Sequence, residues 1–243
     1  SHGHTWFGSG GSKGRCGVGF LLNSRWAHLP AEFKPCSDRL ATLDLKISQQ
    51  MRMRIITTYF PHGGHCDEEV EALYASMQEE CGEARRKKLK VVIAGDFNAE
   101  VGSQSDFDDP TIIGDSPMTT RSHRGDMLLK WCTMHRFVLA NTFDDAGFDE
   151  TWTYRNGDER KLLDYILVDV ALLSFLRCCS VLTSVDIGSD HRPQALELEN
   201  CGKAPRPRKK KRCAKSWRPD AAYRQKLDEL LLARPDHEAS VAK

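Results

Sequence analysis

Three short motifs in the chain place carboxylate, amide and imidazole side chains at the ends of apolar segments. They are Gly95-Asp96-Phe97-Asn98, Leu163-Asp164-Tyr165 and Ser189-Asp190-His191. Asp and His can act as general bases or as metal ligands, and an Asn amide can both donate and accept hydrogen bonds. Loops at strand ends in α/β sheets are common places for such groups. The motifs therefore predict a site for acid–base or metal-assisted chemistry.

Each motif also has a plainer interpretation. Asp96 and Asn98 could form a turn with local side-chain hydrogen bonds, and Asp190-His191 could be an ordinary polar loop. Asp164 could cap a backbone turn, but it interrupts an apolar strand, and an ionised Asp is almost never buried without a partner. His191 is the natural partner, because a carboxylate can orient an imidazole and stabilise its charged form.

Together, in this order, the motifs resemble those of the endonuclease/exonuclease/phosphatase superfamily. They follow Tyr59-Phe60-Pro61, which is similar to the Y-x-P motif of that family, and Trp152 matches an aromatic residue that often precedes the L-D-Y strand. The resemblance covers about residues 4–199 and is closest to non-LTR retrotransposon endonuclease domains and the craniofacial development protein 2-like sequences derived from them. It implies an α/β fold, a four-layer sandwich of two packed mixed sheets flanked by helices.

The same resemblance implies Mg²⁺-dependent phosphodiester hydrolysis by a retrotransposon-type DNA endonuclease. His191 would be the general base or a phosphate contact, held by Asp164. Asp96 would align the nucleophile and help to deprotonate it, and Asn98 would orient it and steady the transition state. These four residues are the expected catalytic set.

The resemblance also implies residues that bind the substrate and the metal. Tyr59 and Trp152 would contact the substrate, and Asp190 would help to hold the metal. Magnesium suits the hard oxygen donors of this set, and the sequence has no cluster of soft ligands. His62-x-x-His65-Cys66 lacks the second half that a zinc site needs, so a loop is expected there.

One departure from the family pattern concerns the N-terminal region. The family opens with a strand that carries an Asn and then a strand that ends in a metal-binding Glu, and neither precedes Trp6. Glu32 lies in an expected loop, and Glu100 follows the Asp96 motif with no strand directly before it, so neither is expected to replace that Glu. We therefore expect an N-terminally truncated domain without its opening strands, weakly active or inactive by itself.

Two other functions stay open. One is a phosphatase of the same fold that acts on a small phosphate ester or an inositol phosphate. The other is a non-catalytic, nucleic-acid-binding relic, which the missing Glu favours. The basic C-terminal region argues against the phosphatase.

Composition narrows the class of protein. The chain has 243 residues, 40% of them hydrophobic, and a formal net charge of +1. The longest apolar runs, such as Val91–Ala94, are far below the roughly 18–20 residues of a membrane helix. No secretory signal is expected. The nine cysteines include no C-x-x-C pair, which favours reduced thiols in a nuclear or cytoplasmic protein.

Charge divides the chain into two parts. Residues 203–243 hold 13 Lys and Arg against 5 Asp and Glu, whereas residues 1–202 hold 22 against 29. We predict a domain over 1–200, a basic linker over 201–219, and a helical tail over 220–243 that leads to a further region, as in a chain that continues into a reverse transcriptase. The run Arg206–Arg212 could contact the DNA phosphate backbone, be a nuclear localisation signal, or be a solubilising linker.

Apolar periodicity predicts the elements between these motifs. Helices are expected from Asp67, as a cap, to the basic residues 85–88, and over 124–136. Strands are expected over 17–22, 43–47, 53–59, 91–94, 137–139, 151–154, 162–168, 181–185 and 194–199. Residues 8–14 and 102–123 are expected to be loops.

Overall fold

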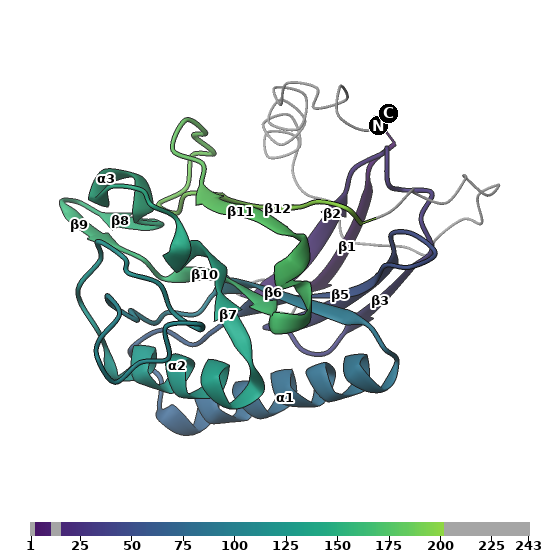
Figure 1. Ribbon diagram of the computed structural model, residues 1–243. Coiled ribbons are helices and arrows are strands. Elements are labelled where there is room, and N and C mark those ends of the chain that lie inside the picture. The colour runs from purple at the N-terminus through teal and green to yellow at the C-terminus, as the bar shows by residue number, and fades with distance from the viewer. Residues whose placement is uncertain (1–2, 11–15, 202–243) are drawn as a thin grey trace.

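A six-stranded mixed sheet forms the centre of the computed structural model, which describes residues 3–10 and 16–201 (Figure 1). Apart from Cys201, the predicted basic linker and helical tail lie outside these residues. The strand order is β3 (Ala31–Pro35), β4 (Leu40–Lys46), β5 (Arg52–Tyr59), β6 (Lys90–Asp96), β10 (Asp164–Asp169) and β7 (Phe137–Leu139). Only β5 and β6 are parallel, and the crossover between them is α1 (Asp67–Arg86).

Two helices cover one face of this sheet. In α1 the apolar residues recur every three or four positions, so that they share one buried side. In α2 (His123–His135), the side chain of Ser122 accepts a hydrogen bond from the Gly125 N–H and caps the first turn, and Arg136 ends the helix with a left-handed backbone. The helices share one core with the sheet residues Ile56 and Ile93.

The opposite face of the sheet is covered by two separate antiparallel pairs of strands. One is β1 (Thr5–Gly10) with β2 (Gly17–Leu22), and the other is β11 (Leu176–Val181) with β12 (Gln194–Leu198). A second apolar core joins Cys179 of β11 to sheet residues such as Val92 and Ile166. The predicted α/β class with packed layers is confirmed, and the second layer consists of these pairs.

Shorter elements complete the described chain. Two 3₁₀ helices, η1 (Ala140–Phe143) and η2 (Val170–Phe175), follow β7 and β10. The short helix α3 (Phe148–Thr151) precedes a hairpin of β8 (Tyr154–Asn156) and β9 (Glu159–Lys161). No helix in the described ranges is both long enough and apolar enough to cross a bilayer, and the eight cysteines described are free thiols.

The structure corrects several expected boundaries. Residues 8–10 belong to β1 instead of a glycine-rich loop, because pairing with β2 holds them extended. Glu32 lies in β3, where pairing with β4 overrides its weak strand propensity. Residues 151–154 were expected to form a strand, but Thr151 ends α3. Residues 181–185 do not form a strand, since β11 already ends at Val181.

The expected cap of α1 is also wrong. Cys66 is the N-cap residue, and its side chain makes no capping hydrogen bond. Asp67 instead lies in the first turn, where a negative charge still favours the helix N-terminus. Its carboxylate binds the Arg124 guanidinium of α2 at 3.0 Å and so ties the two helices together.

Candidate active site

Three neighbouring strands bring the predicted site residues into one row. Tyr59 on β5 and Asp164 on β10 are both direct partners of Asp96 on β6, which lies between them. Partners on adjacent strands project to the same face of a sheet, so the three side chains lie side by side. By strand alternation they share the face of Val92 and Ala94, which points away from the two long helices.

The first motif forms a turn that holds the Asp96 carboxylate. The Asn98 backbone N–H donates to Asp96 Oδ1 at 2.8 Å, and Asn98 Nδ2 donates to Asp96 Oδ2 at 3.1 Å and to the Phe60 carbonyl at 2.9 Å. A Cβ on Gly95 would lie 1.9 Å from the Thr58 carbonyl oxygen, so only glycine allows the parallel strands to approach here. The hydrogen bonds that form the local turn are therefore the same ones that hold the Asp96 carboxylate of the predicted site.

His191 pairs with Asp164, as the sequence predicts. His191 Nδ1 lies 2.8 Å from Asp164 Oδ2, and both side chains are partly exposed. This hydrogen bond is the largest cause that raises the pKa of His191, while burial opposes it. Because Nδ1 is engaged, Nε2 is the ring nitrogen left for a reacting group.

Burial and like charge make Asp96 unusual. Loss of solvent and the nearby Asp164 carboxylate raise the pKa of Asp96 to about 6, against the opposing hydrogen bonds from Asn98. A carboxyl group with such a pKa can take up or release a proton near neutral pH. Perturbed acids of this kind are concentrated at functional sites.

Three polar residues that the sequence analysis missed hold Asp164 in place. Thr153 Oγ1 accepts hydrogen bonds from the N–H groups of Leu163 and Asp164, both at 3.1 Å. The Asp164 carbonyl accepts from Asn141 Nδ2 at 3.1 Å and Gln194 Nε2 at 2.8 Å. A signal was available, because Thr153 and Asn141 are polar residues in apolar segments, but their partners are distant in sequence.

The two predicted substrate contacts differ in accessibility. Tyr59 is half-buried, and the Arg39 guanidinium lies 5.1 Å from the centre of its ring. Trp152 is only 6% exposed, and the Arg192 guanidinium carbon lies 3.2 Å from its ring centre. Trp152 therefore supports Arg192 in this structure, and its direct contact with a substrate stays a prediction.

Asp190 is the residue that the sequence predicts as a metal ligand. Asp190 is exposed, and its carboxylate accepts a hydrogen bond from Ser189 Oγ at 3.3 Å. Within residues 3–10 and 16–201, no group of three or more His, Cys, Asp or Glu side chains is arranged to hold a metal ion. The metal role of Asp190 stays a prediction.

Other candidate ligands are engaged elsewhere. His65 Nδ1 lies 2.9 Å from Glu69 Oε2 in the first turn of α1. Glu100 faces Lys161 at 3.9 Å, and burial raises the pKa of this carboxyl group.

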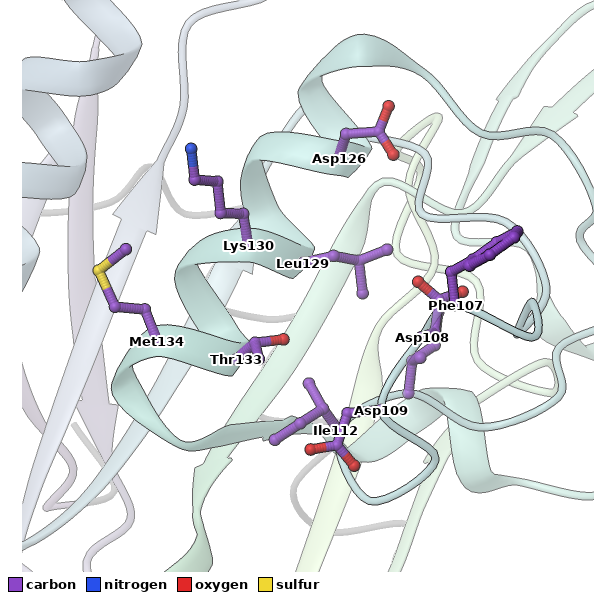
Figure 2. Close-up of a pocket in the computed structure, with 10 residues that line it drawn as sticks. Phe107, Asp108, Asp109, Ile112, Asp126, Leu129, Lys130, Thr133 and Met134 are labelled. Carbon is purple, nitrogen blue, oxygen red and sulfur yellow. The ribbon is translucent and has the colours of Figure 1, made fainter.

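A cavity of about 490 Å³ lies outside this constellation. It is lined by α2 and the 107–113 segment, with Leu129 and Ile112 between the exposed Phe107 and Met134 (Figure 2). Its residue Asp108 is bound by the Arg121 guanidinium at 2.7 Å, so this carboxylate is occupied. None of the predicted site residues lines this cavity.

Comparison with known proteins shows the family of this chain. The model of the Endonuclease/Exonuclease/phosphatase family matches residues 1–191. The chain belongs to this family. Its members include hydrolytic nucleases and phosphatases, and enzymes of the family generally use a divalent metal ion.

Individual relatives agree with this assignment. The chain is 28% identical over 180 residues to craniofacial development protein 2 of Tragulus javanicus, and the match covers 73% of this chain but only 30% of that protein. The endonuclease domain of TRAS1, a telomere-specific non-LTR retrotransposon, superimposes with a TM-score of 0.58 at 15% identity, covering 81% of this chain and 78% of that one. The 3′ phosphatase NExo from Neisseria, bound to product DNA hairpin, gives 0.58 at 18% identity, covering 81% and 80%. These two structures share the fold with this chain.

Proposed function

We propose that this chain is the phosphodiester-cleaving part of a Mg²⁺-dependent DNA endonuclease of the retrotransposon type. The observation that carries the proposal is that Asp96, Asp164 and His191, which lie far apart in sequence, come together where β6 ends and β10 begins. The fold of the TRAS1 endonuclease domain and the basic composition of residues 203–243 support the DNA substrate.

The residues of the chain have distinct roles in this proposal. His191 Nε2 takes a proton from the attacking water, and Asp164 stabilises the resulting imidazolium through Nδ1. As the water oxygen bonds to phosphorus, the P–O bond to the leaving strand breaks, and the leaving oxygen takes a proton from solvent. Asp96 accepts the second hydrogen of that water and so aligns it with the phosphorus atom. Asn98 uses both amide contacts on Asp96 and Phe60, so it acts by positioning Asp96.

The chemistry of the donor atoms supports magnesium as the ion. Hard carboxylate oxygens are present at Asp96 and Asp190, and Mg²⁺ is usually bound by one or two carboxylates together with water and substrate phosphate. Because the described residues do not gather three ligands, no step of the mechanism above depends on the ion.

The wider setting is also a proposal. The chain spans about 30% of the length of the craniofacial development protein 2 relative. We propose that the whole protein also contains a reverse transcriptase region. We propose a nuclear or cytoplasmic protein that contacts the DNA backbone.

Nicking of supercoiled plasmid tests the proposed function. The chain, together with any residues that its gene encodes ahead of Ser1, is incubated with Mg²⁺ or with EDTA. We expect nicking with Mg²⁺ alone, and a loss of at least about 100-fold in His191→Ala, the usual size of general-base catalysis. Lys130→Ala, a change on α2, is the matched control and should nick normally.

Assays of phosphate-ester hydrolysis and of DNA binding on the same protein separate the alternatives. Hydrolysis of soluble phosphate esters or inositol phosphates without nicking would favour the phosphatase. DNA binding without any hydrolysis would favour the non-catalytic relic. Undiminished nicking by His191→Ala would reject the assigned mechanism.

A further inference from the structure

The cavity beside α2 is a groove whose apolar lining is partly open to solvent. The buried side chains of Ile112 and Leu129 line it, together with Phe107 and Met134, which are 100% and 65% exposed. Figure 2 shows Leu129 of α2 pointing toward the segment that carries Phe107 and Ile112. Apolar side chains gathered around an open cavity of about 490 Å³ are typical of a binding surface.

The groove also carries negative charge. Three aspartates and one lysine line it: Asp108, Asp109, Asp126 and Lys130. The Arg121 guanidinium pairs with Asp108, but no basic side chain among the described residues forms an ion pair with Asp109 or Asp126, which are both exposed. The groove therefore favours an apolar ligand that has basic residues beside its apolar surface.

The C-terminal sequence contains a segment with this combination, residues 220–234, which we call the tail segment. Four apolar residues recur there at helical spacing: Tyr223, Leu227, Leu230 and Leu231. In a helix, with about 100° of rotation per residue, these four share one side. Between Tyr223 and Leu231, the charged residues nearest to this side are then Arg224 and Lys226, one on each edge. The tail segment thus matches both the apolar lining and the acidic charge of the groove.

The linker ahead of the tail segment is long enough to reach the groove. The 21 residues 202–222 separate Cys201, the last described residue, from Tyr223. Residues 203–219 hold three prolines, nine Lys or Arg and no acid, a composition that favours an extended chain. At about 3.1 Å per residue such a linker spans about 65 Å, whereas a domain of about 200 residues is about 40–45 Å across. The linker can therefore pass from β12 to α2, which lie on opposite sides of the central sheet (Figure 1).

We propose that the tail segment docks in the groove between α2 and the 107–113 segment of the same chain. Its apolar side packs on Leu129 and Ile112, and its basic edges lie near the unpaired aspartates. Docking covers Phe107 and Met134, which are otherwise exposed to water. It also fixes where the basic linker ends on the domain, away from the candidate active site, because none of the site residues lines the groove.

Photo-cross-linking in the full chain tests this docking. Phe107 is replaced by p-benzoylphenylalanine, which its complete exposure allows, and the peptides joined by irradiation are identified by mass spectrometry. We expect cross-links from position 107 to residues 220–234 within one chain, recovered in the monomer band of a denaturing gel. The same replacement at Phe148, an exposed aromatic residue of α3 outside the groove, is the matched control and should not label the tail segment.

A pair of tail variants separates docking from chance encounters. Leu227→Asp/Leu230→Asp places two charges on the apolar side. The loss of two buried leucines should lower the docking equilibrium at least about 100-fold and remove the cross-link. Gln225→Asp/Leu232→Asp adds the same charge on the opposite side of the helix and should keep the cross-link. Both variants leave residues 3–201 unchanged, and equal thermal unfolding of the two proteins verifies that the domain is intact.

Every result of this experiment decides for or against the docking. A cross-link from position 107 to the tail segment that only Leu227→Asp/Leu230→Asp removes supports it. A cross-link that joins two chains identifies a second copy as the occupant and overturns it. It is also overturned by no labelling of the tail segment from position 107, by equal labelling from position 148, or by equal yields in the two tail variants. Plasmid nicking is not measured here, so the proposed function is judged separately.

Discussion

The central sheet carries charged groups on both faces, and the two groups differ in how far their charges are paired. On the helix side, Arg54 is 2% exposed and pairs with Asp44 at 2.6 Å, Glu80 at 3.0 Å and Glu83 at 3.1 Å. Lys34 and Lys87 add cations at the margin of this network. Every buried charge there has a partner of opposite sign.

The opposite face carries the candidate site, where compensation is incomplete. Asp96 and Asp164 are direct neighbours across two strands. His191 is hydrogen-bonded to Asp164, and no basic side chain among the described residues forms an ion pair with Asp96. The pKa of Asp96 rises to about 6, whereas cationic partners lower the pKa of Glu83 on the helix side. The helix-side ion pairs hold α1 on the sheet. At the site, negative charge on Asp96 and Asp164 is left unpaired and can be neutralised by a proton or a bound cation.

The largest expected effect is on the helix side. Arg54→Ala leaves the carboxylates of Asp44 and Glu80 buried without their main partner, and breaking a buried ion pair costs about 3–5 kcal/mol of unfolding free energy. Urea denaturation measures this loss. Arg52→Ala, two residues earlier and exposed, is the control and should stay within about 0.5 kcal/mol. If Arg54→Ala behaves like Arg52→Ala, the helix-side network does not stabilise the fold.

A smaller effect of opposite sign is expected at the site. The folded-state pKa of Asp96 lies above the unfolded value, so the folded protein binds this proton more tightly, and stability falls as the pH rises from about 4 to about 6. Asp96→Asn removes this penalty. It should be more stable than the parent chain by about 1–3 kcal/mol at pH 7.5 and should lose this advantage near pH 4.

Denaturation of both proteins at the two pH values checks this expectation. The raised pKa of His191 is largely common to both proteins and mostly cancels in the difference. Asp44→Asn on the helix side is the contrasting variant, and it should be destabilised at neutral pH because it loses its pairing with Arg54. An Asp96→Asn protein that is less stable than the parent at pH 7.5 would show that the site carboxylates are well compensated.

Strong local patterns made much of this architecture predictable. The segment over 53–59, rich in residues that favour strands, the apolar segment over 91–94 and the helical spacing after Asp67 correspond to β5, β6 and α1. The pairing of His191 with Asp164 could also be anticipated, because a carboxylate in an apolar strand needs a partner.

What sequence reasoning missed depends on contacts between distant segments. Thr153 looked like a strand residue, although it lies between α3 and β8 and its hydroxyl supports Asp164. Residues 181–185 are apolar enough for a strand, but the pairing of β11 with β12 ends at Val181.

The proposed chemistry depends above all on Asp164 acting through His191 in phosphodiester cleavage. The most direct test compares the rates of Mg²⁺-dependent plasmid nicking by Asp164→Asn, His191→Ala and the double variant, each in the chain with any residues that its gene encodes ahead of Ser1. Residues that act as one unit give non-additive losses, so the double variant should be no slower than His191→Ala alone. A double variant whose loss is the product of the two single losses would contradict this coupling.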